Sequence, residues 1–284
     1  MFWQTTRYRI DLSTPQIMGI VNVTPDSFSD GGRHAKANAA LLHCERLLKD
    51  GAHILDIGGE STRPGSPPVS LEEELARVLP VLHGALTLGV PVSIDSYKPE
   101  VMRVALDLGV DILNDIWALR QQGAEELMAR HPACGVCLMH MHRDPQTMQT
   151  VPMEGDVVPQ VHGFLAESAR SLRARGVAPE RIVLDAGIGF GKTVAQNFAL
   201  LARQNELLDL GYPLLAGWSR KSSLGAVTGL AEAAERMVPS VAAALLAVER
   251  GAAIVRVHDV RETIQALQVL EVTRAQEKKE NNEQ

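Results

Sequence analysis

The chain is poor in aromatic residues and cysteine, and it has no long apolar run. Phe, Trp and Tyr make up 4% of its 284 residues, so the core must be filled by Ala, Leu, Val and Ile, as in parallel sheets and their covering helices. Only three cysteines occur, which argues against a disulfide framework and predicts a reducing, cytoplasmic location. No stretch reaches the roughly 18 apolar residues of a membrane span, and the N-terminus lacks the apolar region of a signal peptide. We therefore expect no membrane partner.

The chain also lacks a basic run and a second cysteine pair. Its formal net charge is −6, so a nucleic-acid partner is not expected. Cys134 and Cys137 form a CxxC within an apolar segment. Without a second such pair, we predict ordinary core cysteines rather than metal or redox ligands.

What the chain does contain is a repeat. A short apolar run, a polar loop and a longer amphipathic stretch recur about every 30–40 residues, the length of a βα unit. Strands are predicted at 17–23, 53–59, 90–96, 111–116, 135–141, 181–187, 212–219 and 252–259. Helices are predicted at 35–50, 70–86, 98–109, 124–132, 157–175, 195–210, 234–251 and 261–276. The helices end at glycines that precede the next strand, as at C-caps: Gly51, Gly89, Gly109, Gly176, Gly211 and Gly251.

Eight strict alternations predict an α/β fold, a single-domain (β/α)8 TIM barrel over residues 1–284. Residues 1–16 are expected to form a short cover over the barrel floor, and the charged tail from about 275 to 284 to be frayed. The alternative is an open doubly wound sheet. It would need a glycine-rich turn after the first strand, where the chain instead has NVTPDSFSDGG.

Polar residues gather where the predicted strands end, which is where barrel enzymes carry their active sites. They are Asn22, Asp56, Asp95, Asn114, His140, Asp185, Ser219, Arg256 and His258. Residues two apart on a strand share a face, so pairs such as Ser93 and Asp95 can both point into the barrel mouth. A single buried polar residue would indicate only a structural pair, whereas six or more at one level favour a binding site.

These residues fall into two groups of opposite character. Asp95, Asn114 and Asp185 offer acceptors and an amide, which suit a neutral heterocycle with several N–H groups. A second group suits an anion: Asn22, Arg63, Lys221, Arg256 and His258. Lys221 could serve either group. The sequence therefore predicts a ligand with a heteroaromatic end and a charged end.

Two other features of the sequence could indicate a function. The segment AGIGFGKT at 186–193 fails as a phosphate-binding P-loop, because Ala186 stands where glycine is required. Its glycines, Gly187, Gly189 and Gly191, more plausibly let the backbone approach a flat ligand. Lys221 as a Schiff-base lysine of a barrel aldolase is a minor alternative.

Eight blocks of the chain resemble bacterial dihydropteroate synthase over about residues 17–265. They are MGIVNVTPDSFSDGG (18–32), DIGGESTRPGS (56–66), SIDSYKPEV (93–101), LNDI (113–116), LMHM (138–141), DAGIGFGK (185–192), GWSRKS (217–222) and RVHDV (256–260). The resemblance implies a transferase of folate synthesis that joins 4-aminobenzoate to 6-hydroxymethyl-7,8-dihydropterin diphosphate and releases pyrophosphate. It also implies a homodimer through the last helices.

The resemblance assigns roles residue by residue. The pterin would be bound by Asp95, Asn114, Met139, Asp185, Gly189, Gly217 and Lys221. The diphosphate would be bound by Asn22, Thr62, Arg63, Arg256 and His258, with Mg²⁺ held through Asn22 and phosphate oxygens. The aminobenzoate pocket would be shaped by Phe28, Thr62, Arg63, Pro64, Phe190, Ser219 and Lys221. The loops Thr24–Arg33 and Ser61–Ser70 would close over the site.

The implied mechanism is dissociative. Mg²⁺, Asn22, Arg256 and His258 would stabilise the leaving diphosphate, while the pterin ring delocalises the positive charge on its methylene carbon. Asp95, Asp185, Lys221 and Arg63 are the expected catalytic residues. No covalent nucleophile is implied.

Two positions depart from expectation, and two related functions remain open. Ala186 stands where the family usually has Pro and could loosen Asp185, and Trp218 is larger than expected.

The alternative functions are a methyltetrahydrofolate–corrinoid methyltransferase, which needs no diphosphate site, and a non-catalytic pterin-binding paralogue, which should have lost loop residues such as Asp26 and Phe28.

Overall fold

The eight predicted strands close into a parallel barrel in the computed structural model, which describes residues 1–24, 33–61, 66–144, 147–148 and 150–282. Around the barrel the strands follow the order β10-β3-β4-β5-β6-β7-β8-β9. This confirms the barrel, and the open-sheet alternative is wrong. The barrel strands are β3 (Gln16–Asn22), β4 (Ile54–Gly58), β5 (Val92–Asp95), β6 (Ile112–Asp115), β7 (Gly135–Met139), β8 (Ile182–Asp185), β9 (Leu214–Ala216) and β10 (Ala252–Val257).

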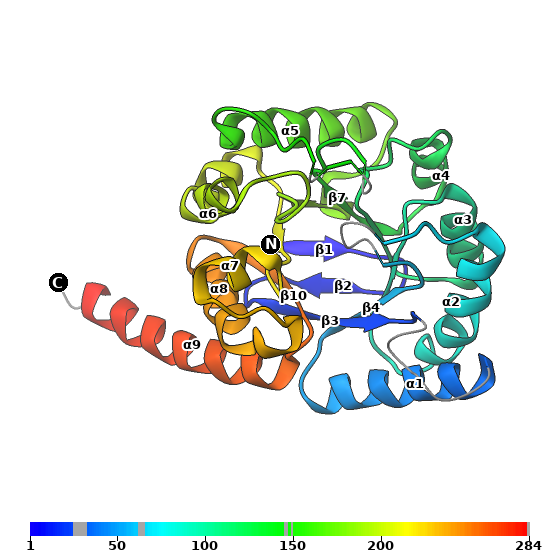
Figure 1. Ribbon diagram of the computed structural model, residues 1–284, viewed down its shortest axis with the longest axis horizontal. Coiled ribbons are helices and arrows are strands. Elements are labelled where there is room, and N and C mark those ends of the chain that lie inside the picture. Colours follow the sequence, from blue (N-terminus) through cyan, green and yellow to red (C-terminus); the bar gives the residue numbers. More distant parts are fainter. Residues whose placement is uncertain (25–32, 62–65, 145–146, 149, 283–284) are drawn as a thin grey trace.

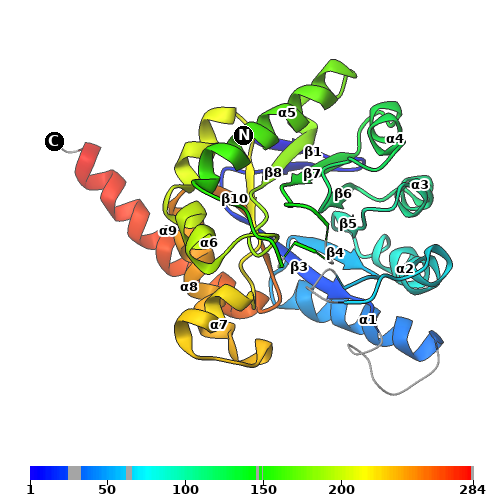
Figure 2. The same ribbon diagram turned by 45° about the horizontal axis from the view of Figure 1, so that its top comes forward.

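Helices surround the barrel, as Figures 1 and 2 show. The α-helices are α1 (Arg33–Lys49), α2 (Leu71–Ala85), α3 (Pro99–Leu108), α4 (Ala124–Arg130), α5 (Val157–Ala174), α6 (Val194–Ala202), α7 (Ser222–Thr228), α8 (Met237–Glu249) and α9 (Val260–Asn282). Short 3₁₀ segments are η2 (Pro179–Arg181), η3 (Gln204–Leu210) and η4 (Ala233–Glu235). Helix α7 is absent from the sequence prediction, and the predicted helix 195–210 is divided into α6 and η3.

Local signals in the sequence explain where the helices begin and end. The side chain of Ser70 accepts a hydrogen bond from Glu73 N at the start of α2, and Thr193 and Gln196 form a capping box at the start of α6. All six predicted capping glycines have positive φ, between 77° at Gly89 and 106° at Gly51. Left-handed backbone of this kind is available to glycine without strain. Gly109 is the C-cap of α3 as predicted, whereas α2 ends at Ala85, before Gly89, and Gly211 ends η3 instead of an α-helix.

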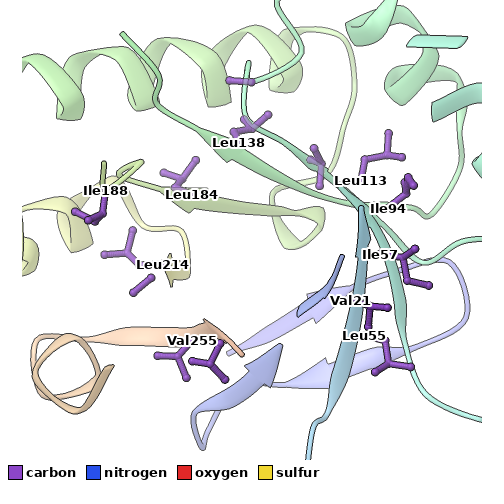
Figure 3. Close-up of a cluster of buried hydrophobic side chains, with 14 of the residues drawn as sticks. Val21, Leu55, Ile57, Ile94, Leu113, Leu138, Leu184, Ile188, Leu214 and Val255 are labelled. Carbon is purple, nitrogen blue, oxygen red and sulfur yellow. The ribbon is translucent and has the colours of Figure 1, made fainter. Parts of the chain in front are cut away.

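The strands are apolar on both faces, and each face packs in a different layer. Figure 3 shows the outer layer, in which side chains such as Val21, Leu55, Leu113 and Val255 lie between the strands and the helices. The inner layer fills the lower barrel with fully or nearly fully buried side chains: Met18, Ile54, Ile112, Cys137, Val183, Leu215 and Ile254. Alternation along each strand sends neighbours to opposite layers, so on β4, β6, β8 and β10 the next inward position toward the carboxyl end carries a polar residue.

A hairpin of β1 (Phe2–Gln4) and β2 (Arg9–Asp11) packs against the amino ends of the strands. Trp3 is fully buried, and its indole Nε1 donates to Arg181 O at 3.0 Å. Arg7 forms an ion pair of 2.6 Å with Asp111, just before β6. These contacts seal the end of the barrel opposite the polar residues.

Helix α9 runs past the barrel, and Figure 1 shows it extending away from the ring of helices. The segment from about 275 to Asn282, for which the sequence predicts fraying, continues this helix. Within the described part of the chain, every helix is too short or too polar to cross a membrane.

Candidate active site

Five strands send a charged or amide side chain into the upper barrel. These are Asp56 from β4, Asp95 from β5, Asn114 from β6, Asp185 from β8 and Arg256 from β10. All but Asp95 lie two positions beyond a residue of the inner apolar layer, such as Ile54 below Asp56, and Asp95 lies two positions beyond the buried Ser93. The strand ends therefore bring together the polar residues that the sequence predicts, at the carboxyl end of the barrel.

Arg256 lies among the carboxylates, not apart from them. Its Nε donates to Asp56 Oδ2 at 2.6 Å and its Nη2 donates to Asp95 Oδ2 at 2.6 Å. Asn114 Nδ2 donates to the same Asp56 oxygen at 3.1 Å. The predicted separation of the site into an acidic group and an anion-binding group therefore does not hold for Arg256, which pairs with the acidic residues. The long Arg256 side chain reaches the buried carboxylates and supplies their counter-charge, without which their burial would be energetically costly.

Asp56 belongs to the site, although it is predicted only as a polar strand end, without a role in binding or catalysis. It is fully buried, and its Oδ1 makes no hydrogen bond within the described residues. The Ser93 hydroxyl, at the paired position on β5, is also buried and without a partner among them. The inward spacing Ile54, Asp56, Gly58 was the signal that could have identified Asp56.

The carboxylate of Asp185 is held at the end of β8. Its Oδ1 accepts from Gly187 N at 2.7 Å, and a Cβ added at Gly217 would come within 3.9 Å of its Oδ2. Burial raises the pKa of Asp185, opposed by the Gly187 hydrogen bond and by the charges of Lys221, Lys192 and Arg256. Residue 217 therefore lies directly beside this carboxylate.

The carboxyl group of Asp95 has a strongly shifted pKa. Burial raises it to about 7, and the neighbouring Asp56 adds to the shift, while Arg256 opposes it. A carboxyl group poised near neutrality is typical of functional sites.

An apolar wall stands above these groups. Ile116, Met139, Met141, Met148 and Phe190 form one buried cluster. Lys221 Nζ lies 4.3 Å from the centre of the Phe190 ring, a cation–π contact. A Cβ added at Gly189 would meet Lys221 Cδ at 3.3 Å, so the Lys221 side chain lies across Gly189 and Phe190. This wall could hold a flat ring with a cation beside it.

The remaining described candidates lie on neighbouring strand ends. Ser219 Oγ is 2.9 Å from His258 Nδ1 and also accepts from His258 N at 3.1 Å, which joins the ends of β9 and β10. Asn22 is the last residue of β3 and is half-buried. The predicted residues Asp26, Phe28, Thr62, Arg63 and Pro64 lie outside the described residues.

The two unusual positions next to the site face a shared cavity. Trp218 points away from the pore, is almost fully buried and packs against Phe198 with ring centres 5.3 Å apart. Ala186 and Trp218 line one cavity together with Leu200 and Gln204 of the outer layer. The large side chain at 218 therefore fills space beside the small one at 186, without entering the pore.

The two cysteines of the CxxC motif lie in the core. Cys134 and Cys137 are buried and free, and burial raises the pKa of Cys134 to about 12, which confirms them as core residues. The described residues contain no cluster of three or more His, Cys, Asp or Glu side chains suited to a metal ion.

Comparison with known proteins agrees with this site. Residues 18–258 match the family model of the pterin binding enzymes. A protein of Neisseria meningitidis serogroup B named dihydropteroate synthase is 54% identical over 274 residues, covering 95% of this chain and 96% of the relative. The Escherichia coli protein of the same name is 46% identical and covers 93% of each chain.

Solved structures show the same similarity. The dihydropteroate synthase of Xanthomonas albilineans, solved with 4-aminobenzoic acid, superposes with a TM-score of 0.91 at 46% identity and covers 97% of this chain and 99% of its own. That of Burkholderia cenocepacia, complexed with 7,8-dihydropteroate, has a TM-score of 0.89 at 50% identity and covers 98% of each.

Proposed function

The chain belongs to the dihydropteroate synthases, a family of pterin-binding enzymes, and from this we propose how its residues share the reaction. It is a transferase that condenses 4-aminobenzoate with 6-hydroxymethyl-7,8-dihydropterin diphosphate, releasing pyrophosphate, a step of folate synthesis. The observation that carries the assignment of residues is the convergence of Asp56, Asp95, Asn114, Asp185 and Arg256 inside one end of the barrel.

The pterin end of the substrate is assigned to the deep part of the pore. Asp185 and Asn114 would pair with the amino-pyrimidine edge, since a buried carboxylate and an amide match its donors and acceptors. Asp95 would accept from the reduced ring. Met139 and Gly217 would line the faces of the slot, and Lys221 would contact the ring system. An analogue lacking these donors would leave the carboxylates unpaired, which gives the site its selectivity.

The diphosphate end is assigned to the lip formed by β3 and β10. Asn22 and His258 would bind phosphate oxygens, together with Thr62 and Arg63. Arg256 would link the two ends, because it already contacts the carboxylates of the pterin region. Mg²⁺ fits this donor set, since it commonly takes one or two protein oxygens and completes its shell with phosphate and water. When bound, it would neutralise charge on the leaving diphosphate.

The bond changes follow from this arrangement. The bond from the methylene carbon to the diphosphate oxygen breaks, and the electron pair leaves with pyrophosphate. The aryl amine then attacks that carbon, and its proton passes to solvent or pyrophosphate. Asp95 and Asp185 supply negative potential for the charge that develops on the pterin, and Phe190, Ser219 and Lys221 would orient the aminobenzoate together with Phe28, Arg63 and Pro64.

A pyrophosphate-release assay tests the function. Release should require both substrates together and should fall when EDTA removes divalent cations. Tight binding of the pterin diphosphate without release would favour the non-catalytic paralogue, and methyl transfer from methyltetrahydrofolate to a corrinoid would favour the methyltransferase. The similarity to synthases over more than nine-tenths of the chain argues against both.

We also propose a homodimer and a cytoplasmic location. Apolar side chains are exposed on the last helices, with Val238 and Val269 each 69% exposed and Val272 64% exposed. Exposed apolar groups gathered on neighbouring helices are typical of an interface. The free cysteines suit a reducing compartment, which cell fractionation would test.

A further inference from the structure

Lys192 is a buried cation that the proposed reaction does not use. It follows the glycine-rich segment of residues 187–191 and precedes α6, and only 3% of it is exposed. A lysine is rarely buried to this extent unless it is paired. Within the described residues no carboxylate forms an ion pair with it.

Four acceptors lie within 3.4 Å of Lys192 Nζ, the most distant of them His140 O. Nζ lies 2.9 Å from His140 Nδ1, 2.8 Å from Gly187 O and 3.2 Å from Phe190 O. Burial and the charge of Lys192 lower the pKa of His140 to about 2, so its imidazole is neutral and can accept through Nδ1. Burial lowers the pKa of Lys192 to about 7, and the charge of Asp185 opposes this shift. The hydrogen bonds and the Asp185 carboxylate thus together compensate the buried amino group.

These hydrogen bonds join the end of β7 to the segment that follows β8. The two are pressed together: a Cβ added at Gly187, where φ is 67°, would lie 1.8 Å from His140 O, and one at Gly191 would lie 2.6 Å from His142 Cβ. Lys192 lies beneath this contact and holds carbonyls at both ends of the segment 187–190. A phosphate-binding lysine would instead extend outward.

The segment held by Lys192 carries Phe190, whose ring contacts Lys221 Nζ at 4.3 Å. Because Lys192 binds the carbonyl of Phe190, a change at 192 would alter the position of that ring. We propose that Lys192 is a positioning residue, which fixes the segment 187–191 so that Phe190 and Lys221 form the wall against which the aminobenzoate ring binds. This inference rests on the proposed assignment of Phe190 to that pocket.

The test is the variant Lys192→Met, which keeps the length of the side chain and removes its donors and charge. The Michaelis constants of both substrates and kcat would be measured in a pyrophosphate-release assay. The KM for 4-aminobenzoate should rise about tenfold or more, the scale of losing hydrogen bonds from a charged group. The KM for the pterin diphosphate and kcat should change much less.

Arg181→Met is the matched control. Arg181 is a buried cation that also donates to backbone carbonyls, those of Cys134 and Met128, but at the sealed end of the barrel. It should lower the melting temperature without changing either KM. If Lys192→Met lowers the melting temperature and leaves the KM for aminobenzoate as in Arg181→Met, Lys192 is only structural and the proposal is wrong. An equal rise in both KM values would also overturn it.

Two further variants keep the result interpretable. Phe190→Ala should raise the KM for aminobenzoate; if it does not, the assignment of Phe190 fails independently of Lys192. A rise with Phe190→Ala but none with Lys192→Met would refute only the role of Lys192. Should Lys192→Met not fold, Lys192→Gln retains two N–H donors and should give a smaller rise in the same KM, whereas an unchanged KM would count against the proposal.

Discussion

Arg256 reaches across the pore to Asp95, although their strands β10 and β5 are separated by β3 and β4 in the barrel. The same guanidinium contacts Asp56. One guanidinium group thus forms ion pairs with two carboxylates, so a change at Arg256 alters the electrostatics of both.

Removing Arg256 should cost stability as well as activity. Arg256→Met leaves the fully buried Asp56 without its cation, and breaking a buried pair in this way costs about 3–5 kcal/mol. The free energy of unfolding from urea denaturation would measure this loss. Adding Asp56→Asn should recover part of it, and a double variant whose loss equals the sum of the single losses would show that the two residues are not coupled.

Replacing Asp185 should weaken pterin binding with little change in fold. Asp185→Asn keeps an oxygen for the Gly187 hydrogen bond but loses the charge and one acceptor toward the ligand. We expect the dissociation constant of a pterin, measured by calorimetry, to rise about tenfold to a hundredfold. Asp107→Asn is the control, because Asp107 lies exposed on α3. Near-normal binding by Asp185→Asn would remove this residue from the pterin site.

The raised pKa of Asp95 predicts how stability depends on pH. In the folded protein its pKa is about 7, whereas an unfolded Asp titrates near 3.9. Between these values the folded state binds the extra proton, so this residue makes stability fall as pH rises from about 4 to 7. Asp95→Asn lacks this titration and should gain melting temperature relative to the parent chain between pH 5 and pH 8. A constant difference across that range would contradict the shifted pKa.

A strained turn follows β6 next to the site. Ala118 and Leu119 have φ values of 51° and 59°, and the Asp115 carboxylate accepts from Trp117 N and Leu119 N. Left-handed backbone costs about 1–2 kcal/mol in a residue with a side chain. Ala118→Gly should therefore leave stability unchanged or raise it by up to about 1 kcal/mol. The same change at Ala105, within α3, should lower it by about 1 kcal/mol; similar losses at both sites would refute the strain.

The proposed dimer can be tested on α9. Val269→Asp and Val272→Asp place charges on its exposed apolar face and should shift the mass measured by light scattering toward the monomer. Leu42→Asp, at a comparably exposed position on α1, should not. A monomeric parent chain would contradict the proposal directly.

The barrel could be predicted from the sequence because each strand is a short apolar run. Its side chains alternate between the inner layer and the helix-covered outer layer. Ile54 and Asp56 illustrate this: two-residue spacing sends both inward, one into the apolar layer and one into the site. Helix α7 could not be predicted in the same way, because SSLGAVT is short, contains glycine and has no amphipathic pattern. The break after α6 likewise depends on tertiary packing.

The contacts of Arg256 and Lys192 could not be predicted from spacing. Spacing along a strand predicts the face from which a side chain projects. The polar end of a long side chain can nevertheless lie far from its own Cα, next to the nearest opposite charge or hydrogen-bond acceptor. Arg256, which the sequence places in the anion-binding group, therefore lies among carboxylates. The motif that carries Lys192 resembles a phosphate-binding loop in sequence, whereas its lysine turns back onto its own loop.

The hairpin that carries Trp3 and the apolar layer above it close the amino-terminal end of the barrel. A ligand therefore reaches the buried carboxylates from the carboxyl end, and a molecule bound near the mouth would block its passage. The pterin diphosphate must then load before the aminobenzoate, and the joined product must leave as one piece by the same route. Initial-rate kinetics should accordingly show a compulsory order of addition.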